Sequence, residues 1–170
     1  EVATGSPMLP AGSEHFGGFL AKLDFDQFDR LYDPTHGWAA HGSYFYAAGD
    51  GYDKADLDLR ATDNFGDYIL HGRIRGAGSF TGSLPFYDPV ALGGFLNLSG
   101  FARNQIVGES LMYGNVRLEK IVGRLPAGLR GDMRVGLALE GGKVDGRYTE
   151  TNLNGWQSSV TAYVGGETPL

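Results

Sequence analysis

The sequence has 170 residues, enough for one domain with a sizeable core, and 28 of them are glycine, more than double the usual share of about 7%. Its net charge of −6 argues against a nucleic-acid partner, because that binding depends on Lys and Arg. The chain has no cysteine, which excludes disulfides and thiolate metal sites, and no apolar run approaches the roughly 18 residues of a membrane helix.

Hydrophobic alternation with a period of two predicts strands along most of the chain. After a polar lead-in over residues 1–15, seven segments alternate, and each sets an apolar face against a polar or charged one. They are about as long as a tilted strand that crosses a bilayer, roughly 9–11 residues, whereas ordinary strands average nearer 5–6. The segments cover residues 19–26, 38–48, 54–62, 70–76, 112–120, 129–140 and 156–164.

The predicted connections differ in length. Residues 63–67 and 122–127 form short links, residues 79–109 a very long one, and residues 141–154 one of moderate length. Short turns on one side and long loops on the other are typical of a transmembrane β-barrel. A soluble antiparallel barrel with one solvent-exposed face would give the same alternation and is the alternative to a transmembrane barrel. The apolar faces are diluted with Ala and Gly, which lipid contact tolerates better than a close-packed core does.

The polar faces of the later segments carry mixed charges, which can pair across strands inside an enclosed lumen. Two carboxylate pairs, Asp24 with Asp26 and Asp56 with Asp58, each share a strand face. Glycosidases use paired carboxylates, but abundant basic neighbours here favour ion pairs instead. The predicted lumen wall comprises Arg73, Arg75, Arg117, Glu119, Arg130, Asp132, Arg134 and Glu140.

The long link over residues 79–109 is too apolar for a disordered segment. Loops longer than about 12–15 residues are usually functional or disordered, so this one is expected to fold against another surface. In a barrel the available place is the lumen, and the Gly93-Gly94 pair permits the tight backbone that re-entry needs. Its apolar residues are Phe80, Leu84, Phe86, Tyr87, Val90, Leu92, Phe95, Leu96, Leu98 and Phe101.

Catalytic motifs are absent from the sequence. It contains no G-x-S-x-G nucleophile elbow, no H-E-x-x-H metal motif and no phosphate-binding G-x-x-x-x-G-K-[ST] loop. The four histidines are scattered along the chain. The sequence therefore predicts no catalytic residue, no metal ligand and no cofactor in this chain.

One stretch resembles a known family. The sequence PFYDPVALGGFLNLSGF (85–101), followed by NVRLE (115–119), is similar to the sixth extracellular loop and the next strand of the outer-membrane assembly-factor superfamily, also called bacterial surface antigens. The resemblance implies a sixteen-stranded barrel whose loop tip folds into the lumen. The residues that would dock this loop are Gly93, Gly94, Leu98, Ser99, Gly100 and Phe101.

Three further stretches match the superfamily in order. Asp29 with DPTHG (33–37) resembles its periplasmic turn, Glu140-Gly141-Gly142 takes the place of its F-x-D-x-G strand motif, and GETPL (166–170) resembles the turn before its last two strands. The resemblance implies that residues 16–170 form about seven strands of a larger barrel. The open edges would then be sealed by further segments or other copies, because unpaired strands are costly in lipid.

The chain departs from the family at one position of interest. Ser99 stands where the assembly factors have a loop arginine, and the expected acidic partner falls near Glu140, so their arginine–aspartate contact is not expected here. The L-S-G-F variant is most similar to the autotransporter-like barrels that follow patatin-like phospholipase domains. The serine–aspartate dyad of those lipases matches no position in this chain.

Three functions remain open from the sequence. The first is an outer-membrane anchor and translocation pore for an N-terminal passenger, with a patatin-like lipase as the expected passenger. The second is an assembly factor that inserts other barrels and takes a substrate polypeptide as its partner. The third is a soluble, lipocalin-like barrel for an apolar ligand. The first two predict a bacterial outer-membrane location and contact with the lipid bilayer.

Overall fold

A computed structural model of the chain describes residues 17–31, 33–49, 51–124, 132–146, 153 and 155–166. The predicted lead-in over residues 1–15 therefore lies outside the described residues. The described part is an all-β, antiparallel structure, and none of its residues lies in a helix long and apolar enough to cross a membrane. Its strands are β1 (Gly18–Asp26), β2 (Gly37–Ala47), β3 (Tyr52–Phe65), β4 (Tyr68–Gly78), β5 (Val90–Leu92), β6 (Ile106–Gly108), β7 (Ser110–Arg124), β8 (Asp132–Asp145) and β9 (Gln157–Gly166).

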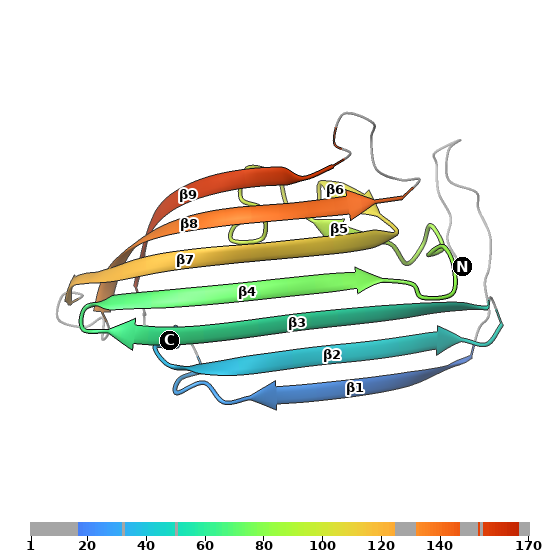
Figure 1. The fold of residues 1–170 in the computed structure, drawn as a ribbon, viewed down its shortest axis with the longest axis horizontal. Coiled ribbons are helices and arrows are strands. Elements are labelled where there is room, and N and C mark those ends of the chain that lie inside the picture. Colours follow the sequence, from blue (N-terminus) through green and yellow to red (C-terminus); the bar gives the residue numbers. More distant parts are fainter. Residues whose placement is uncertain are drawn as a thin grey trace.

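Seven strands form one sheet in the order β1-β2-β3-β4-β7-β8-β9, each antiparallel to the next. Across the described residues this sheet is open, with β1 and β9 as its edges (Figure 1). Strands β5 and β6 form a separate two-stranded sheet within residues 79–109, and Figure 1 draws it against the β7–β8 half of the large sheet.

Strands β3, β4, β7 and β8 are longer than the sequence predicts. Strand β8 continues to Asp145 instead of ending at Glu140, so the connection after it is shorter than residues 141–154. The alternation does not predict this extension, because Gly141 and Gly142 interrupt the apolar and polar pattern. Gly142 lies inside the strand at a crowded point, since a Cβ there would come within 2.6 Å of the Leu92 side chain. The first residues of this predicted strand, 129–131, lie outside the described residues.

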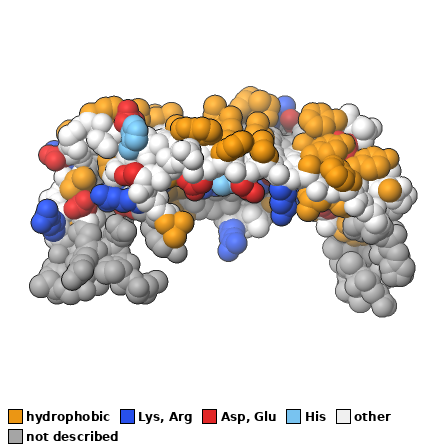
Figure 2. Space-filling model, turned by 90° about the horizontal axis from the view of Figure 1, so that it is seen from below, with side chains coloured by type: hydrophobic (Ala, Val, Ile, Leu, Met, Phe, Trp, Pro, Cys, Tyr) orange, Lys and Arg blue, Asp and Glu red, His pale blue; other side chains and the backbone are white. Residues whose placement is uncertain are grey.

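The two faces of the large sheet differ in chemistry, as the alternation predicts. We call the face against which residues 79–109 pack the loop-bearing face, and the opposite one the free face. On β8 the free face carries Val135, Leu137 and Leu139, all exposed, while Arg134 and Glu140 on the loop-bearing face are buried. Figure 2 shows the sheet edge-on, with hydrophobic side chains gathered along one side and many charged side chains beneath them.

Exposed aromatic side chains gather at both ends of the free face. Trp38 and Tyr46 mark these ends on β2 and are eight positions apart, about 26 Å along a strand. The side chains between the two ends are mostly aliphatic. One end carries Phe25, Trp38, Phe65 and Tyr68, and the other carries Phe19, Tyr46 and Trp156.

The apolar core lies between the folded loop and the sheet. Leu84, Leu92 and Leu98 from the loop are fully buried and cluster with Leu111 and Tyr113 of β7. The loop-bearing face is apolar only under this loop and becomes charged toward the opposite ends of the strands. Residues 79–109 therefore supply the cover that the sheet needs at one end.

Candidate functional site

Glu140 holds the tip of the folded loop against the sheet. Its carboxylate accepts hydrogen bonds from the backbone N–H groups of Leu98 at 3.0 Å and Ser99 at 2.9 Å. The hydroxyl groups of Tyr113 and Ser159 complete the arrangement at 2.7 and 2.8 Å. A buried carboxylate with four donors is well compensated for its loss of water. We call this arrangement the Glu140 anchor.

The register of the sheet brings these donors together. Glu140 on β8 lies directly opposite Asn115 on β7 and Ser159 on β9. The Asn115 amide donates to the Tyr113 hydroxyl at 2.7 Å, and that hydroxyl lies within donating distance of both the Glu140 carboxylate and the Leu96 carbonyl oxygen. Two adjacent strands and the loop therefore converge on one carboxylate.

Tight backbone turns shape the loop tip. Gly93 and Gly94 have φ values of 124° and 116°, and a Cβ on Gly93 would come within 2.3 Å of the Ala102 carbonyl oxygen. Leu98 also has a positive φ of 76°, which turns its amide and that of Ser99 toward Glu140. The Ser99 hydroxyl accepts a hydrogen bond from the Leu96 N–H at 2.8 Å. This bond joins two residues of the tip and stabilises the turn between them.

The six residues predicted to dock the loop therefore lie together at this tip. Leu98 is buried, Phe101 packs against the core, and Gly100 is exposed beside Ser159. Ser99 contacts Glu140 through its main-chain amide.

Two acidic contacts hold the base of the loop. Asp53 at the start of β3 is buried and accepts hydrogen bonds from Ser79 Oγ at 2.8 Å and from the Thr81 N–H at 2.9 Å. Lys54 Nζ lies 2.5 Å from an Asp88 carboxylate oxygen. The loop is thus bound to the sheet at its base as well as at its tip.

Asp56 and Asp58 of β3 form ion pairs with arginines of β3 and β4. Asp58 binds Arg73 at 2.6 Å and Arg60 at 3.0 Å, and Asp56 binds Arg75 at 2.6 Å. The ion-pair interpretation of the Asp56 and Asp58 pair is therefore confirmed, and both carboxylates are engaged by guanidinium groups.

A second cluster centres on Glu119 of β7. Its carboxylate lies 3.2 Å from Arg134, 3.3 Å from both His71 and Arg117, and 2.5 Å from the Tyr163 hydroxyl. Tyr163 reaches Glu119 by crossing over Gly136, where a Cβ would come within 2.3 Å of its ring. An aromatic ring laid over a strand glycine fixes the register of neighbouring strands.

The turn between β1 and β2 also contacts the loop-bearing face. Asp33 in this turn binds Arg134 at 2.9 Å, and the Arg134 side chain is only 2% exposed. Asp29 closes the turn by accepting from the Thr35 hydroxyl at 2.5 Å and from the Thr35 and His36 N–H groups. The Thr35 hydroxyl above all lowers the pKa of Asp29 to about 2.

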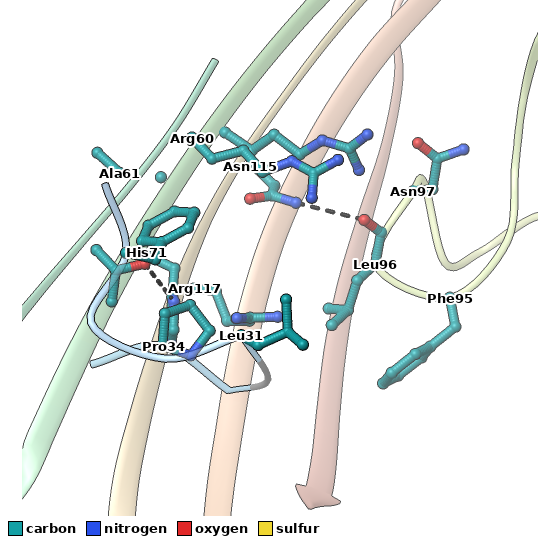
Figure 3. A pocket seen from close by; sticks show the side chains of 14 residues that line it. Leu31, Pro34, Arg60, Ala61, His71, Phe95, Leu96, Asn97, Asn115 and Arg117 are labelled. Atoms are coloured by element: carbon teal, nitrogen blue, oxygen red, sulfur yellow. Dashed lines mark hydrogen bonds between the residues drawn. The ribbon is translucent and has the colours of Figure 1, made fainter. Parts of the chain in front are cut away.

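A cavity of about 330 Å³ lies between this turn and the loop tip. In Figure 3, Leu31 and Pro34 of the turn face Phe95, Leu96 and Asn97 of the tip across it. The strands beneath contribute basic and polar side chains, among them Arg60, His71, Arg73, Asn115 and Arg117.

Arg130 and Asp132 are the remaining residues of the predicted lumen wall. Asp132 lies at the start of β8, and Arg130 lies outside the described residues. Sequence reasoning did not single out Tyr113, Ser159, Tyr163, His71 and Asp33 as partners of the predicted wall, although Ser159, Tyr163 and His71 lie on predicted polar faces. Among the described residues no group of acidic or histidine side chains could hold a metal ion.

Comparison with known proteins gives no assignment: no protein-family model matches the chain, and none of the curated proteins matches it.

Proposed function

We propose that this chain is part of a transmembrane β-barrel of the bacterial outer membrane that anchors an N-terminal passenger and forms its translocation pore. The observation that carries the proposal is the contrast between the two faces. The free face is largely apolar and exposed between its aromatic ends, which would be an aggregation liability in water. Most charged side chains of the other face are held by ion pairs and by the folded loop, as a lumen wall requires.

The exposed aromatic side chains at the two ends of the free face support the same assignment. Outer-membrane barrels carry aromatic girdles on both sides of an apolar band about 25 Å tall. At a tilt of about 40°, the separation of Trp38 and Tyr46 along β2 spans on the order of 20 Å of height. Aromatic rings suit this position because one part of each ring system is apolar and another tolerates water.

The resemblance to barrels that follow patatin-like phospholipase domains suggests a lipase as the passenger. The Glu140 anchor supports a pore that is closed at rest, since the loop is bound at its tip and its base. In this proposal the remaining barrel strands pair with β1 and β9, and the chain itself carries out no catalysis.

An assembly factor that inserts other barrels is the second candidate. It shares the fold and the folded-in loop. Ser99 stands at the position of the loop arginine of that branch, and Glu140 binds main-chain amides instead. A serine cannot supply the bidentate contact of an arginine, so we favour the anchor.

A soluble, lipocalin-like barrel would require the opposite distribution of side chains. Its apolar residues would face the enclosed side, and its charges would face water. Here Leu57, Val116, Leu137 and Val160 are 49% to 70% exposed on the free face, while Glu119, Arg134 and Glu140 are buried on the other. The distribution therefore disfavours this candidate.

Fractionation of cells that express the full-length protein tests the proposal. We expect the protein in the outer-membrane fraction, and we expect faster migration of the unheated sample on a denaturing gel. Leu137→Arg, at an exposed apolar position of β8, should cost about 2–4 kcal/mol if it lies near the bilayer midplane, and should abolish both results. Ala102→Arg adds the same charge to the exposed part of the loop and should abolish neither. A protein that remains soluble without detergent would refute the proposal.

A further inference from the structure

The cavity between the β1–β2 turn and the loop tip has an unusual lining. Its volume of about 330 Å³ lies at the lower end of ligand pockets, roughly 300–1,000 Å³. The described residues that line it include several basic side chains and no acidic one. Its basic side chains are Arg60, His71, Arg73 and Arg117.

The guanidinium groups at the floor of the cavity retain unused donors. Asp58 engages only Nε and one terminal nitrogen of Arg60 and of Arg73. Arg117 forms an ion pair with Glu119, with 3.3 Å between Nε and the carboxylate, but its Nε makes no hydrogen bond. Among the described residues nothing accepts a hydrogen bond from Arg117, so its two terminal nitrogens can bind an anion.

The sides of the cavity are apolar. Leu31 from the turn is 83% exposed and Phe95 from the loop tip is 65% exposed, although both lie on the charged, loop-bearing face. Phe28 and Pro34 add apolar surface beside Leu31. Large apolar side chains that face each other across a basic floor suit an amphiphilic ligand. Its acidic group would contact the basic floor, and its hydrocarbon part would contact the apolar sides.

We propose that this cavity binds a single-chain aliphatic carboxylate, that is, a fatty acid. Its carboxylate lies against Arg117, and its hydrocarbon chain lies between Leu31 and Phe95. An inorganic anion would leave these two side chains uncovered, and a phospholipid with two chains is several times larger than the cavity. A threaded polypeptide is disfavoured because the turn and the loop tip close the cavity from two sides. The inference rests on the proposed function only in taking the loop-bearing face as the lumen.

Site-mapped photolabelling tests the proposal. The probe is dodecanoate with a diazirine near its methyl end, added to the full-length protein in phosphatidylcholine nanodiscs, and labelled peptides are identified by mass spectrometry. We expect labels in residues 27–36 and 93–97 that unlabelled dodecanoate competes away. Arg117→Gln should reduce this labelling about tenfold, the effect of losing a charge-assisted hydrogen bond. Arg103→Gln, at an exposed loop position outside the cavity, should leave it unchanged.

Three results would overturn the fatty-acid site. Labels confined to free-face positions such as Leu57 and Leu137 would reflect the bilayer alone. Equal labelling by the corresponding dodecyl alcohol would exclude recognition of the carboxylate. Labelling that appears only after deletion of the passenger would identify polypeptide as the natural occupant. Because both variants should still show the unheated gel shift, failure of the barrel itself would be detected separately.

Discussion

Glu140 is the residue on which docking of the loop tip depends. Four donors point at its carboxylate, and two of them are main-chain amides that no other described side chain satisfies. Alternation placed Glu140 on the polar face of its strand, but the identity of its partners could not be predicted, because backbone N–H groups carry no residue-type signal. The partners Tyr113 and Ser159 lie on the same face by alternation, which was visible but did not indicate a shared acceptor.

Glu140→Ala should release the loop tip while the sheet remains folded. Loss of charge-assisted hydrogen bonds, each worth about 1.5–3 kcal/mol, should raise local opening of the loop at least tenfold. Trypsin cleavage after Arg103, which is exposed on this loop, measures the opening rate in micelles. Ser159→Ala removes one hydroxyl donor and should produce a smaller increase. Equal cleavage of the wild type and Glu140→Ala would show that the anchor does not hold the loop.

Gly93→Ala should disrupt the loop tip for a different reason. A left-handed backbone costs a residue with a Cβ roughly 1–2 kcal/mol, and this Cβ would also collide with the Ala102 carbonyl. The unfolding midpoint in denaturant should fall accordingly. Gly82→Ala is the matched control, because it lies on the same loop with open space around it. The explanation fails if both variants are equally stable.

At the scale of elements, the strands could be predicted better than the connections. Alternation located all seven strands of the large sheet and their two faces, since each side chain of a strand points opposite to the next. Strand ends were less accurate where glycine interrupts the pattern, as at Gly141 and Gly142. The three-residue strands β5 and β6 were missed because so short a run has no measurable period. The contact between Asp33 and Arg134 joins residues far apart in sequence, so no local sequence pattern predicts it.

The β1–β2 turn should loosen in acid. Hydrogen bonds from Thr35 hold the pKa of Asp29 near 2, below its ordinary value of 3.8. A lowered pKa means that the stabilising contribution of Asp29 is fully present above its ordinary pKa and is lost as the pH falls toward 2. Amide exchange at Thr35 and His36, corrected for the intrinsic pH dependence, should accelerate over this range. Asp29→Ala should exchange rapidly at every pH, and identical profiles for the two proteins would contradict the assignment.

At the scale of the whole molecule, the two faces of the open sheet differ in chemistry. The free face is an apolar surface with aromatic side chains at both ends. The loop-bearing face carries ion pairs, and the long loop and the β1–β2 turn pack against it. The loop and the turn approach the same charged face from opposite ends of the strands and enclose the cavity between them. Composition and alternation predicted this polarity, whereas the enclosure of the cavity follows from tertiary contacts alone.

The side of β8 that faces lipid tests the central claim most directly. The chain has no cysteine, so single cysteine substitutions at positions 133–140 can each carry a nitroxide label in the full-length protein in bilayers. We predict high oxygen accessibility at Met133, Val135, Leu137 and Leu139 and low accessibility at the alternate positions, because oxygen concentrates in the hydrocarbon region. Preferential access of a water-soluble nickel reagent to the four apolar positions would contradict the barrel assignment.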